Sequence, residues 1–332
     1  MRFVVTGGAG FIGSHLVERL INDGAEVTVL DNFSTGHREN LSWIASDRLE
    51  VIECDIGISG SWGEEFRDVD GVFHLAALAD IVPSIKNPDK YFNSNVTGTL
   101  NILEACRTND VGRVVYTASS SCYGDDAPVP TNEVDLTDPK YPYALTKLLG
   151  EQLMFHWGRV YGISCQSFRL FNVYGTRSRT SGSYGAMFGV FLAQKLANEP
   201  LTVVGDGAQS RDFIYVSDVV EALVAGMNSG KGGEVFNVGT GMPISVNHIV
   251  DLLGCEKVFI PKRPGEPDIT QADNSKAKSL LSWEPTISIE DGVNRLLAEI
   301  NYWSEAPVWT QESIAEETKD WFRCMGRNEI ES

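Results

Sequence analysis

The segment TGGAGFIG, from Thr6 to Gly13, constrains the fold of this 332-residue chain more than any other feature. It follows the β-branched run RFVVT and opens the stretch GSHLVERLINDG, whose apolar spacing predicts a helix. Gly8, Gly10 and Gly13 fit the pattern GxGxxG, while Gly7, Gly10 and Gly13 fit GxxGxxG. Because glycines lack a Cβ, such a turn brings backbone N–H groups and a helix N-terminus close to a pyrophosphate. The segment therefore predicts a dinucleotide-binding βαβ unit at the start of the chain.

Strand and helix signals alternate through the first half of the chain. Short β-branched runs separated by helical apolar spacing imply right-handed βαβ units and a parallel sheet. After about Tyr174 the alternation loosens into loops, short strands and helices. We therefore expect an α/β fold, in which a Rossmann-type doubly wound parallel sheet is joined by a smaller, interleaved C-terminal lobe. The strands expected in the first half are residues 2–8, 25–31, 49–56, 71–77, 113–120 and 164–175.

The same pattern predicts how the chain is divided. The sheet domain is expected to span residues 1–173, with returns to the sheet near 212–240. The smaller lobe is expected to comprise residues 174–211 and 241–304. Residues 305–332 form an acidic tail with two tryptophans, and the sequence leaves open whether this tail packs as a helix or frays.

The composition restricts the partners of the protein. The formal net charge is -18, from 45 acidic and 27 basic residues, so the surface repels nucleic acid and anionic membranes. The longest apolar runs are far shorter than a membrane span, and the first residues enter a strand with no room for a signal peptide. The six cysteines are scattered without a CxxC pair, which favours reduced thiols. We expect a cytoplasmic protein that binds neither nucleic acid nor membranes.

The histidines do not indicate a metal site. All five are dispersed, with no spacing typical of metal ligands. His74, at the end of an expected strand, is interpreted as a buried, hydrogen-bonded residue. We therefore expect no metal.

Asp31 supports dinucleotide binding. It ends the second expected strand, eighteen residues after Gly13. A carboxylate at this place holds the adenosine ribose hydroxyls and repels a 2′-phosphate, which favours NAD over NADP. Arg38 argues the other way, because a nearby arginine can accommodate that phosphate.

The stretch YPYALTK carries the candidate chemistry. Tyr143 and Lys147 are spaced i, i+4, so they share one face of a helix. A free tyrosine, with a pKa of about 10, is a poor base at neutral pH. A lysine ammonium and a nicotinamide cation beside the ring would both lower that pKa. Such pairs are common on helix surfaces, and this one gains its significance from the glycine turn and Asp31.

Seven motifs follow one another along the chain: TGGAGFIG, LDNFSTG, CDI, HLAA, NVTGT, YALTK and RDFIYVSD. With them the chain resembles the extended short-chain dehydrogenase/reductase family, and most closely its nucleotide-sugar branch, typified by UDP-glucose 4-epimerase. The similarity extends from Arg2 to about Leu297. It implies NAD as cofactor and a UDP-sugar in the cleft between the sheet domain and the smaller lobe. It also implies a homodimer in which two helices of each subunit form a four-helix bundle.

The resemblance implies roles residue by residue. Ser119, at the end of an expected strand, joins Tyr143 and Lys147 as the catalytic group. Of Ser94 and Asn95, one is implied at the nicotinamide ribose, and the choice stays open. The residues implied for NAD, besides Tyr143 and Lys147, are Gly7, Gly10, Phe11, Ile12, Gly13, Asp31, Asn32, Ser34, Thr35, Gly36, Asp55, Ile56, Leu75, Ala76, Ala77, Ala79, Ser94 and Asn95. The residues implied for the UDP-sugar, besides Ser119 and Tyr143, are Asn172, Val203, Val204, Arg211, Arg263, Glu266 and Thr270.

The implied reaction is epimerisation at C4 of the sugar. Tyr143 takes the proton of the 4-hydroxyl while C4 gives its hydride to NAD. The resulting 4-keto sugar turns in the cleft and takes the hydride back on its other face. Ser119 would share a hydrogen bond with the same hydroxyl and with Tyr143.

Two alternatives stay open. The 4,6-dehydratases and glucuronate decarboxylases of the family carry acidic residues just after the catalytic serine position, where this chain has Ser120 and Ser121. Elimination needs a positioned acid and base, so these reactions are disfavoured without being excluded. The alternative of another class is a non-catalytic NAD-binding sensor or scaffold. It is disfavoured because Ser119, Tyr143 and Lys147 are all present.

Three positions bear on the identity of the sugar. Thr270 is small where strict glucose/galactose epimerases can carry tyrosine, which leaves room for an N-acetyl group. Asn172 stands where glucuronate 4-epimerases tend to have threonine, and this argues against glucuronate. The stretch 175–189 departs from the familiar epimerase pattern, with Ala186 in place of an asparagine, and leaves a specialised activity open.

Overall fold

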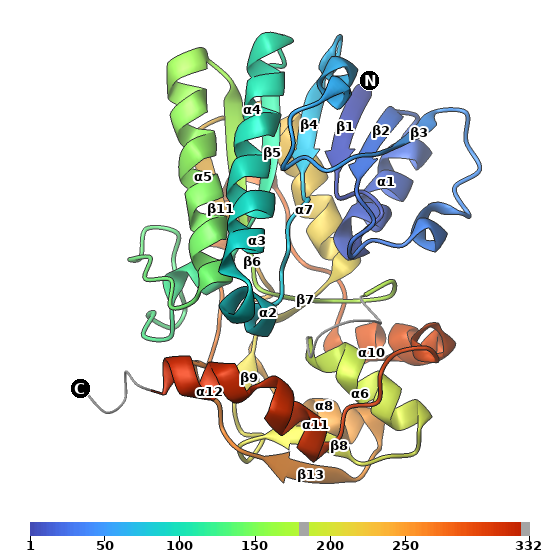
Figure 1. The fold of residues 1–332 in the computed structure, drawn as a ribbon, viewed down its shortest axis with the longest axis vertical. Helices are drawn as coiled ribbons and strands as arrows, with labels where there is room; N and C mark the ends of the chain where they lie inside the picture. The colour runs from blue at the N-terminus through green and yellow to red at the C-terminus, as the bar shows by residue number, and fades with distance from the viewer. Residues whose placement is uncertain (179–185, 327–332) are drawn as a thin grey trace.

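The larger lobe is built on a parallel sheet (Figure 1). A computed structural model describes residues 1–178 and 186–326 of the chain. The main sheet has seven strands in the order β11-β6-β5-β4-β1-β2-β3, and all neighbouring strands run parallel. The expected α/β, Rossmann-type fold is thereby confirmed. Its strands are β1 (Arg2–Thr6), β2 (Glu26–Asp31), β3 (Leu49–Glu53), β4 (Gly71–His74), β5 (Arg113–Ser119), β6 (Ser164–Leu170) and β11 (Glu234–Val238).

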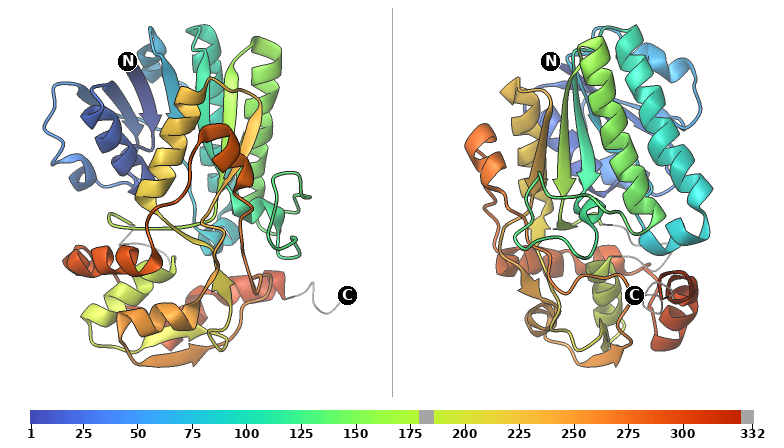
Figure 2. Two further views of the ribbon diagram at one scale, coloured as in Figure 1. Left: turned by 180° about the vertical axis from the view of Figure 1, so that it is seen from behind. Right: turned by 90° about the vertical axis from the view of Figure 1, so that its left-hand side faces the viewer.

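Helices cover both faces of the sheet (Figure 2). One face carries α1 (Phe11–Asn22) and α7 (Val216–Ser229), and the other carries α4 (Gly98–Thr108) and α5 (Pro142–Tyr161). The inner strands are consequently buried on both sides, and every residue of β4 is buried. This explains why these strands are apolar along their whole length and do not alternate with polar residues.

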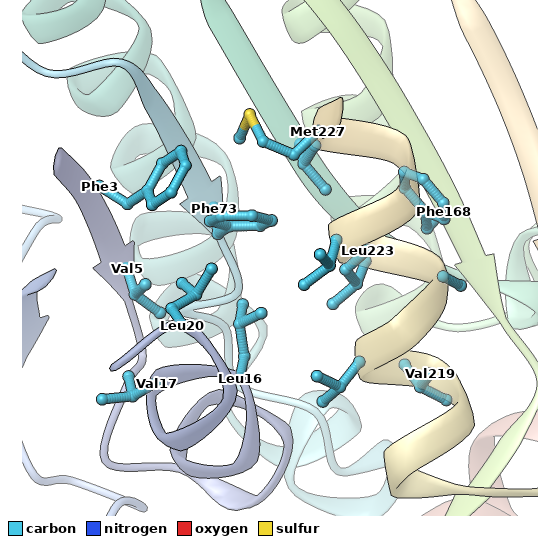
Figure 3. Packing of buried hydrophobic residues seen from close by; sticks show 14 of the residues in the cluster. Phe3, Val5, Leu16, Val17, Leu20, Phe73, Phe168, Val219, Leu223 and Met227 are labelled. Atoms are coloured by element: carbon cyan, nitrogen blue, oxygen red, sulfur yellow. The ribbon is translucent and has the colours of Figure 1, made fainter. Parts of the chain in front are cut away.

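The core under α1 and α7 holds the glycine turn in place (Figure 3). Phe3 and Phe73 meet edge to face, with ring centroids 5.5 Å apart. Leu16 of α1 and Leu223 of α7 point into the same layer. Burial of each such side chain contributes about 1.5–3 kcal/mol, so this layer fixes α1 against β1 and with it the turn that connects them.

The strand order reverses between β1 and β4. From β1 the chain moves outward to β2 and β3, whereas from β4 it moves outward to β5 and β6 on the other side. Loops that follow neighbouring strands at such a reversal diverge and open a crevice at the carboxyl edge of the sheet. The glycine turn follows β1 and therefore lies at this crevice.

One expected strand is divided in two. Residues 164–175 form β6 within the sheet and β7 (Asn172–Tyr174), which pairs in parallel with β10 (Phe213–Tyr215). The chain changes partner at Phe171, whose N–H donates to the carbonyl of Val238 at 2.9 Å. As a result Asn172 leaves the sheet and turns towards the smaller lobe.

The smaller lobe lies beyond the carboxyl edge of the sheet (Figure 1). Its core contains Phe191, Ile249 and Leu296, which come from three different helices. Short strand pairs, β8 with β13 and β9 with β12, complete it. Its elements are α6 (Met187–Leu196), β8 (Leu201–Val204), β9 (Ser210–Arg211), β12 (Ile244–Ser245), α8 (Val246–Leu253), β13 (Lys257–Ile260) and α10 (Ile289–Ala298).

Shorter helices occupy the connections. Two of them, α2 and α3, precede α4 and pack against α5. Another, α9, packs on α7 and β11. These elements are α2 (Ile81–Lys86), α3 (Pro88–Phe92), α9 (Ser275–Leu281), η1 (Arg38–Leu41), η2 (Ser61–Phe66), η3 (Asn93–Thr97), η4 (Ser120–Tyr123) and η5 (Ile300–Trp303).

The acidic tail packs as two short helices as far as residue 326. These are α11 (Gln311–Glu317) and α12 (Lys319–Met325). Thr310 caps α11 by accepting a hydrogen bond from the N–H of Ser313. Trp321 of α12 is 2% exposed. Packing of the buried tryptophan thus decides between the two possibilities that the sequence left open for this part of the tail.

The glycine turn generates a test of the fold. A Cβ on Gly13 would lie 2.1 Å from the carbonyl oxygen of Gly7, so Gly13→Ala forces the backbone of the turn to shift. Overpacking of this kind costs typically about 1–3 kcal/mol, and we expect the free energy of unfolding in urea to fall by that amount. Gly112→Ala is the matched control, because its Cβ would meet no atom within 4 Å. Equal stability of the two variants would contradict the close approach.

Candidate active site

A cavity of about 630 Å³ lies between the carboxyl edge of the sheet and the smaller lobe. Residues of both lobes line it, from the glycine turn after β1 to the loop after β13. Most residues that the sequence singled out are brought together in this lining. They are Gly7, Gly10, Phe11, Ile12, Gly13, Asp31, Asn32, Ser34, Thr35, Asp55, Ile56, Leu75, Ala76, Ala77, Ala79, Ser94, Ser119, Tyr143, Asn172, Arg211, Arg263, Glu266 and Thr270.

The glycine turn is closed by its own backbone. Gly7 has a φ of 69°, a left-handed conformation that disfavours a side chain. The N–H of Gly10 donates to the carbonyl of Gly7 at 3.1 Å. This places the first turn of α1 at the cavity wall, where the free N–H groups of a helix N-terminus favour an anion.

The carboxylate of Asp31 is held by the backbone of two neighbouring loops. It accepts hydrogen bonds from the N–H of Ala9 at 2.9 Å and from that of Phe33 at 2.8 Å. Burial raises the pKa of Asp31, and these two donors lower it. Arg38, which would have favoured a 2′-phosphate, pairs with Glu53 and covers the Phe33 ring at 3.9 Å. Arg38 is thus engaged by Glu53 and Phe33, while the Asp31 carboxylate lines the cavity.

Ser119 and Tyr143 meet at the cavity wall. Ser119 is the last residue of β5, and Tyr143 lies in the first turn of α5. Both side chains line the cavity, and Ser119 favours the phenolate form of Tyr143. Burial raises the pKa of Tyr143, and Ser119 only partly opposes this. We expected a lysine ammonium and a nicotinamide cation to lower the pKa of Tyr143. With the protein groups alone, burial dominates and this pKa is raised.

Lys147 follows Tyr143 by one helical turn on α5 and lies outside the cavity lining. Its ammonium stands over the Tyr116 ring, with Nζ 4.4 Å from the ring centroid. Burial lowers the pKa of Lys147 to about 7, and the nearby Glu151 acts in the opposite direction. A lysine in this setting changes charge close to neutral pH, which suits a group that tunes a neighbouring acid.

Glu151 extends the row of polar residues along α5. Its carboxylate forms a buried ion pair with Arg169 of β6, with an N–O distance of 2.6 Å, and accepts a hydrogen bond from Ser167 at 2.7 Å. Sequence reasoning did not identify this pair. The signal was available, because Tyr143, Lys147 and Glu151 follow one another at intervals of four residues.

Two arginines converge on one glutamate at the far end of the cavity. Glu266 forms ion pairs with Arg263 at 2.8 Å and with Arg211 at 3.7 Å. Burial lowers the pKa of Arg211. A pair of nearly buried guanidinium groups facing a cavity is suited to bidentate binding of a diphosphate.

Asn172 and Thr270 lie beside each other. The hydroxyl of Thr270 donates to the side-chain oxygen of Asn172 at 3.4 Å. The same hydroxyl accepts from the N–H of Asp212 at 3.2 Å. Thr270, which we connect with the size of the sugar, is therefore hydrogen-bonded to Asn172, which we connect with the diphosphate.

Five of the sequence-derived site residues lie outside the cavity lining, namely Gly36, Asn95, Lys147, Val203 and Val204. Asn95 is buried, and its side-chain amide forms hydrogen bonds with Leu78 and Thr146. Its neighbour Ser94 lines the cavity. Val203 is fully buried in the smaller lobe. The carbonyl of Val204 accepts from Gln209 at 2.8 Å. Gly36 packs on Ala9.

Several lining residues were not anticipated from the sequence. Tyr141, Trp309 and Trp321 belong to this group. Tyr141 stands within YPYALTK, so its place beside Tyr143 was a usable signal. The tryptophans come from the tail and carry no motif. Of the stretch 175–189, Ala186 and Arg177 line the cavity, whereas residues 179–185 lie outside the part that the structure describes.

The described residues contain neither a metal-binding cluster nor a membrane-spanning helix. Within 1–178 and 186–326, no group of three or more His, Cys, Asp or Glu side chains is arranged to hold a metal ion. His74 bonds Thr6 at 2.7 Å and Thr99 at 2.9 Å, which confirms it as a buried, hydrogen-bonded residue. Among the helices described, none combines the length and the apolar character that a membrane crossing needs.

Comparison with protein families places this site in a known context. The model of the NAD dependent epimerase/dehydratase family matches residues 3–239. A UDP-glucose 4-epimerase of Mycolicibacterium smegmatis is 37% identical over 303 residues, which cover 88% of this chain and 96% of the relative. UDP-glucuronic acid decarboxylase 1 of Arabidopsis thaliana is 37% identical over 312 residues, which cover 90% of this chain and 69% of the relative.

Solved structures share the whole architecture. A UDP-N-acetylglucosamine 4-epimerase from Methanobrevibacter ruminantium, in complex with UDP-N-acetylmuramic acid, superposes with a TM-score of 0.84 at 32% identity, over 90% of this chain and 98% of that structure. A UDP-glucuronic acid 4-epimerase from Bacillus cereus, in complex with UDP-glucuronic acid and NAD, superposes with a TM-score of 0.84 at 34% identity, over 92% and 99%.

The buried lysine generates a prediction about pH. Below pH 7 Lys147 is protonated in the folded and the unfolded chain, so the cost of burying its charge is fully present. Above pH 7 the folded chain loses this proton first, and the cost diminishes as the pH approaches 10.5. Lys147→Met removes the cost. We expect the free energy of unfolding of wild type, relative to Lys147→Met, to rise by about 3 kcal/mol between pH 6.5 and 9.5.

Urea unfolding of dinucleotide-stripped protein at the two pH values measures this difference. Lys278→Met, on the exposed surface of α9, is the control substitution. A difference between wild type and Lys147→Met that does not change with pH would contradict the burial of a titrating ammonium.

Proposed function

The chain belongs to the NAD dependent epimerase/dehydratase family, and on this basis we propose that it epimerises a UDP-sugar at C4 through a transient 4-keto sugar. The observation that carries the proposal is that Ser119 and Tyr143 line one cavity together with the glycine turn. We further propose that residues 174–211 and 241–304 bind the nucleotide sugar and residues 1–173 bind NAD.

The larger lobe fits a dinucleotide. Gly7, Gly10 and Gly13 line the cavity at the glycine turn, where the N-terminus of α1 would hold the pyrophosphate. The Asp31 carboxylate would hold the adenosine ribose, and Ser94 the nicotinamide ribose. When bound, NAD takes up the hydride of the sugar C4 and returns it. Because a 2′-phosphate would be repelled at Asp31, the site favours NAD over NADP.

Tyr143 would move the proton of the sugar 4-hydroxyl, and Ser119 would hold that hydroxyl in place. To accept the proton, Tyr143 must reach its phenolate form, which burial opposes. A positive charge next to the ring favours the phenolate. Lys147 can supply that charge from behind, and its depressed pKa of about 7 makes its protonation responsive to the phenolate and to any further cation in the cavity.

The decarboxylase among the relatives is the alternative within the family. Against it stand Ser120 and Ser121, which line the cavity next to Ser119. The Ser121 hydroxyl lies 2.8 Å from that of Ser119. These hydroxyl groups do not provide the carboxyl acid or base that decarboxylation and dehydration require near this position.

Arg211 and Arg263 would bind the diphosphate together with Asn172, and Glu266 would meet the nucleoside ribose. Glu266 already holds both guanidinium groups in place. Thr270, a small residue, lines the cavity beside Asn172, which supports acceptance of a sugar with an acetamido group. We therefore propose that N-acetylated UDP-sugars are accepted.

We also propose a cytoplasmic homodimer. The outer surface of α4 and α5, which lie side by side, is open to such pairing (Figure 2). Exposed apolar side chains on this surface include Leu145, Val160 and Tyr161 of α5. A four-helix bundle would cover them. All six cysteines are free, which accords with a reducing compartment.

The activity is tested by an NMR time course of purified protein with UDP-N-acetylglucosamine, then UDP-glucose, without added NAD. We expect the galacto epimer to appear at constant mass. Tyr143→Phe should lower turnover by about a hundredfold or more while UDP binding persists, since general acid–base groups contribute 10²–10⁴-fold. Tyr161→Phe, at the exposed end of the same helix, is the matched control. A product lighter by water would assign dehydration, and a product lighter by carbon dioxide in a parallel time course with UDP-glucuronic acid would assign decarboxylation.

Thr270 is tested by its effect on two substrates. We expect Thr270→Tyr to lower kcat/KM for UDP-N-acetylglucosamine about tenfold more than for UDP-glucose, because a bulky ring excludes the acetamido group first. Thr270→Ser keeps a small side chain with a hydroxyl and serves as the control. If both sugars lost activity equally, Thr270 would not be the gate.

A further inference from the structure

The C-terminal helix α12 supplies one wall of the cavity. Trp321 of this helix lines the cavity together with Arg263 and Tyr141. Only 2% of Trp321 is exposed, although α12 is a seven-residue helix at the surface. A buried tryptophan usually directs its indole N–H to a hydrogen-bond partner, so the contacts of Trp321 show which parts of the cavity wall it can position.

Trp321 holds the loop that carries Arg263. Its indole N–H donates to the carbonyl of Pro264 at 2.8 Å. Its ring lies 5.5 Å from the guanidinium carbon of Arg263, within the range of a cation–π interaction. Both the backbone and the charge of this loop are thereby fixed, and Arg263 is kept in its ion pair with Glu266.

Trp321 also supports the residue next to the candidate base. Its ring centroid lies 6.5 Å from that of Tyr141. Tyr141 in turn stacks on Tyr143, at 6.5 Å and an interplanar angle of 10°, and is hydrogen-bonded to Ser121. One indole therefore connects the arginine end of the cavity with its tyrosine end.

The segment that carries Trp321 is attached to both lobes. Glu317 forms a 2.9 Å ion pair with Lys86 of α2. Gln311 donates to the carbonyl of Phe259 in β13 at 3.0 Å. Figure 1 shows α11 and α12 passing from the smaller lobe to a place below α2. Residues 305–326 therefore bridge the two sides of the cavity.

We propose that Trp321 is a positioning residue for the UDP-sugar, which holds Arg263 at the diphosphate and Tyr141 beside the sugar. The proposal rests on the function proposed above. It makes the segment 305–326 a part of the substrate site. Trp321 contacts the 263–264 loop and Tyr141. The glycine turn and Asp31, which we propose for NAD, belong to other elements, namely β1, α1 and β2. NAD retention should therefore not depend on Trp321.

The test compares variants of two adjacent residues of α12 in the full-length holoenzyme. Trp321→Leu removes the ring and its N–H, and Trp321→Phe keeps a ring without the N–H. Phe322→Leu is the matched control, because Phe322 is 38% exposed. The measurements are the Kd of UDP by calorimetry, kcat and KM for the UDP-sugar that wild type turns over, the NAD content and the melting temperature.

We expect Trp321→Leu to weaken UDP binding about tenfold, which corresponds to about 1.4 kcal/mol, and to raise KM by a similar factor. Its kcat should stay within about twofold of wild type and its NAD content unchanged, and Trp321→Phe should fall between it and wild type. UDP binding in Trp321→Leu equal to that in Phe322→Leu would overturn the proposal. So would joint loss of UDP and NAD, which would mean a purely structural role. If wild type bound no UDP and epimerised no UDP-sugar, the proposed function itself would fail.

Discussion

All strands of the main sheet end at the same edge, and the site depends on this constraint. Residues that are far apart in the sequence, such as the glycine turn after β1, Asp31 after β2 and Ser119 at the end of β5, meet there because the strands are parallel. The reversal of strand order between β1 and β4 separates the loops and opens the crevice. The apolar layer under α1 and α7 packs α1 against the sheet and so fixes the glycine turn at this edge.

Charged side chains are buried near Tyr143 in the larger lobe, and their burial disfavours the charged forms. Lys147 is 4% exposed, and burial depresses its pKa to about 7. Its neighbours along α5 and β6, Glu151 and Arg169, form a buried ion pair that is closed by Ser167 and by the carbonyl of Glu133. Buried charges are tolerated when such partners satisfy them, and a depressed lysine pKa lets the tyrosine site respond to small changes in charge. The burial that destabilises the ammonium thus also brings the pKa of Lys147 close to neutral pH.

The end of the cavity that we propose for the UDP-sugar is shaped by contacts between segments of the smaller lobe and the tail. Glu266 orders two arginines, Thr270 contacts Asn172, and Trp321 fixes the loop from which Arg263 arises. None of these contacts is local in sequence except the pair Arg263 and Glu266. These long-range contacts therefore set the shape of the cavity at this end.

The sequence by itself determined the fold class, the glycine turn, Asp31 and the pairing of Tyr143 with Lys147, because these are set by local spacing: a strand followed by glycines, a carboxylate at a strand end, and two residues one helical turn apart. It could not choose between Ser94 and Asn95, since only packing shows that the Asn95 amide is used up by Leu78 and Thr146. It did not reveal that the pKa of Tyr143 is raised, because that shift comes from burial. It left the tail undecided, and the tertiary structure decided it through Trp321, whose partners Tyr141 and Pro264 lie 180 and 57 residues away in the chain.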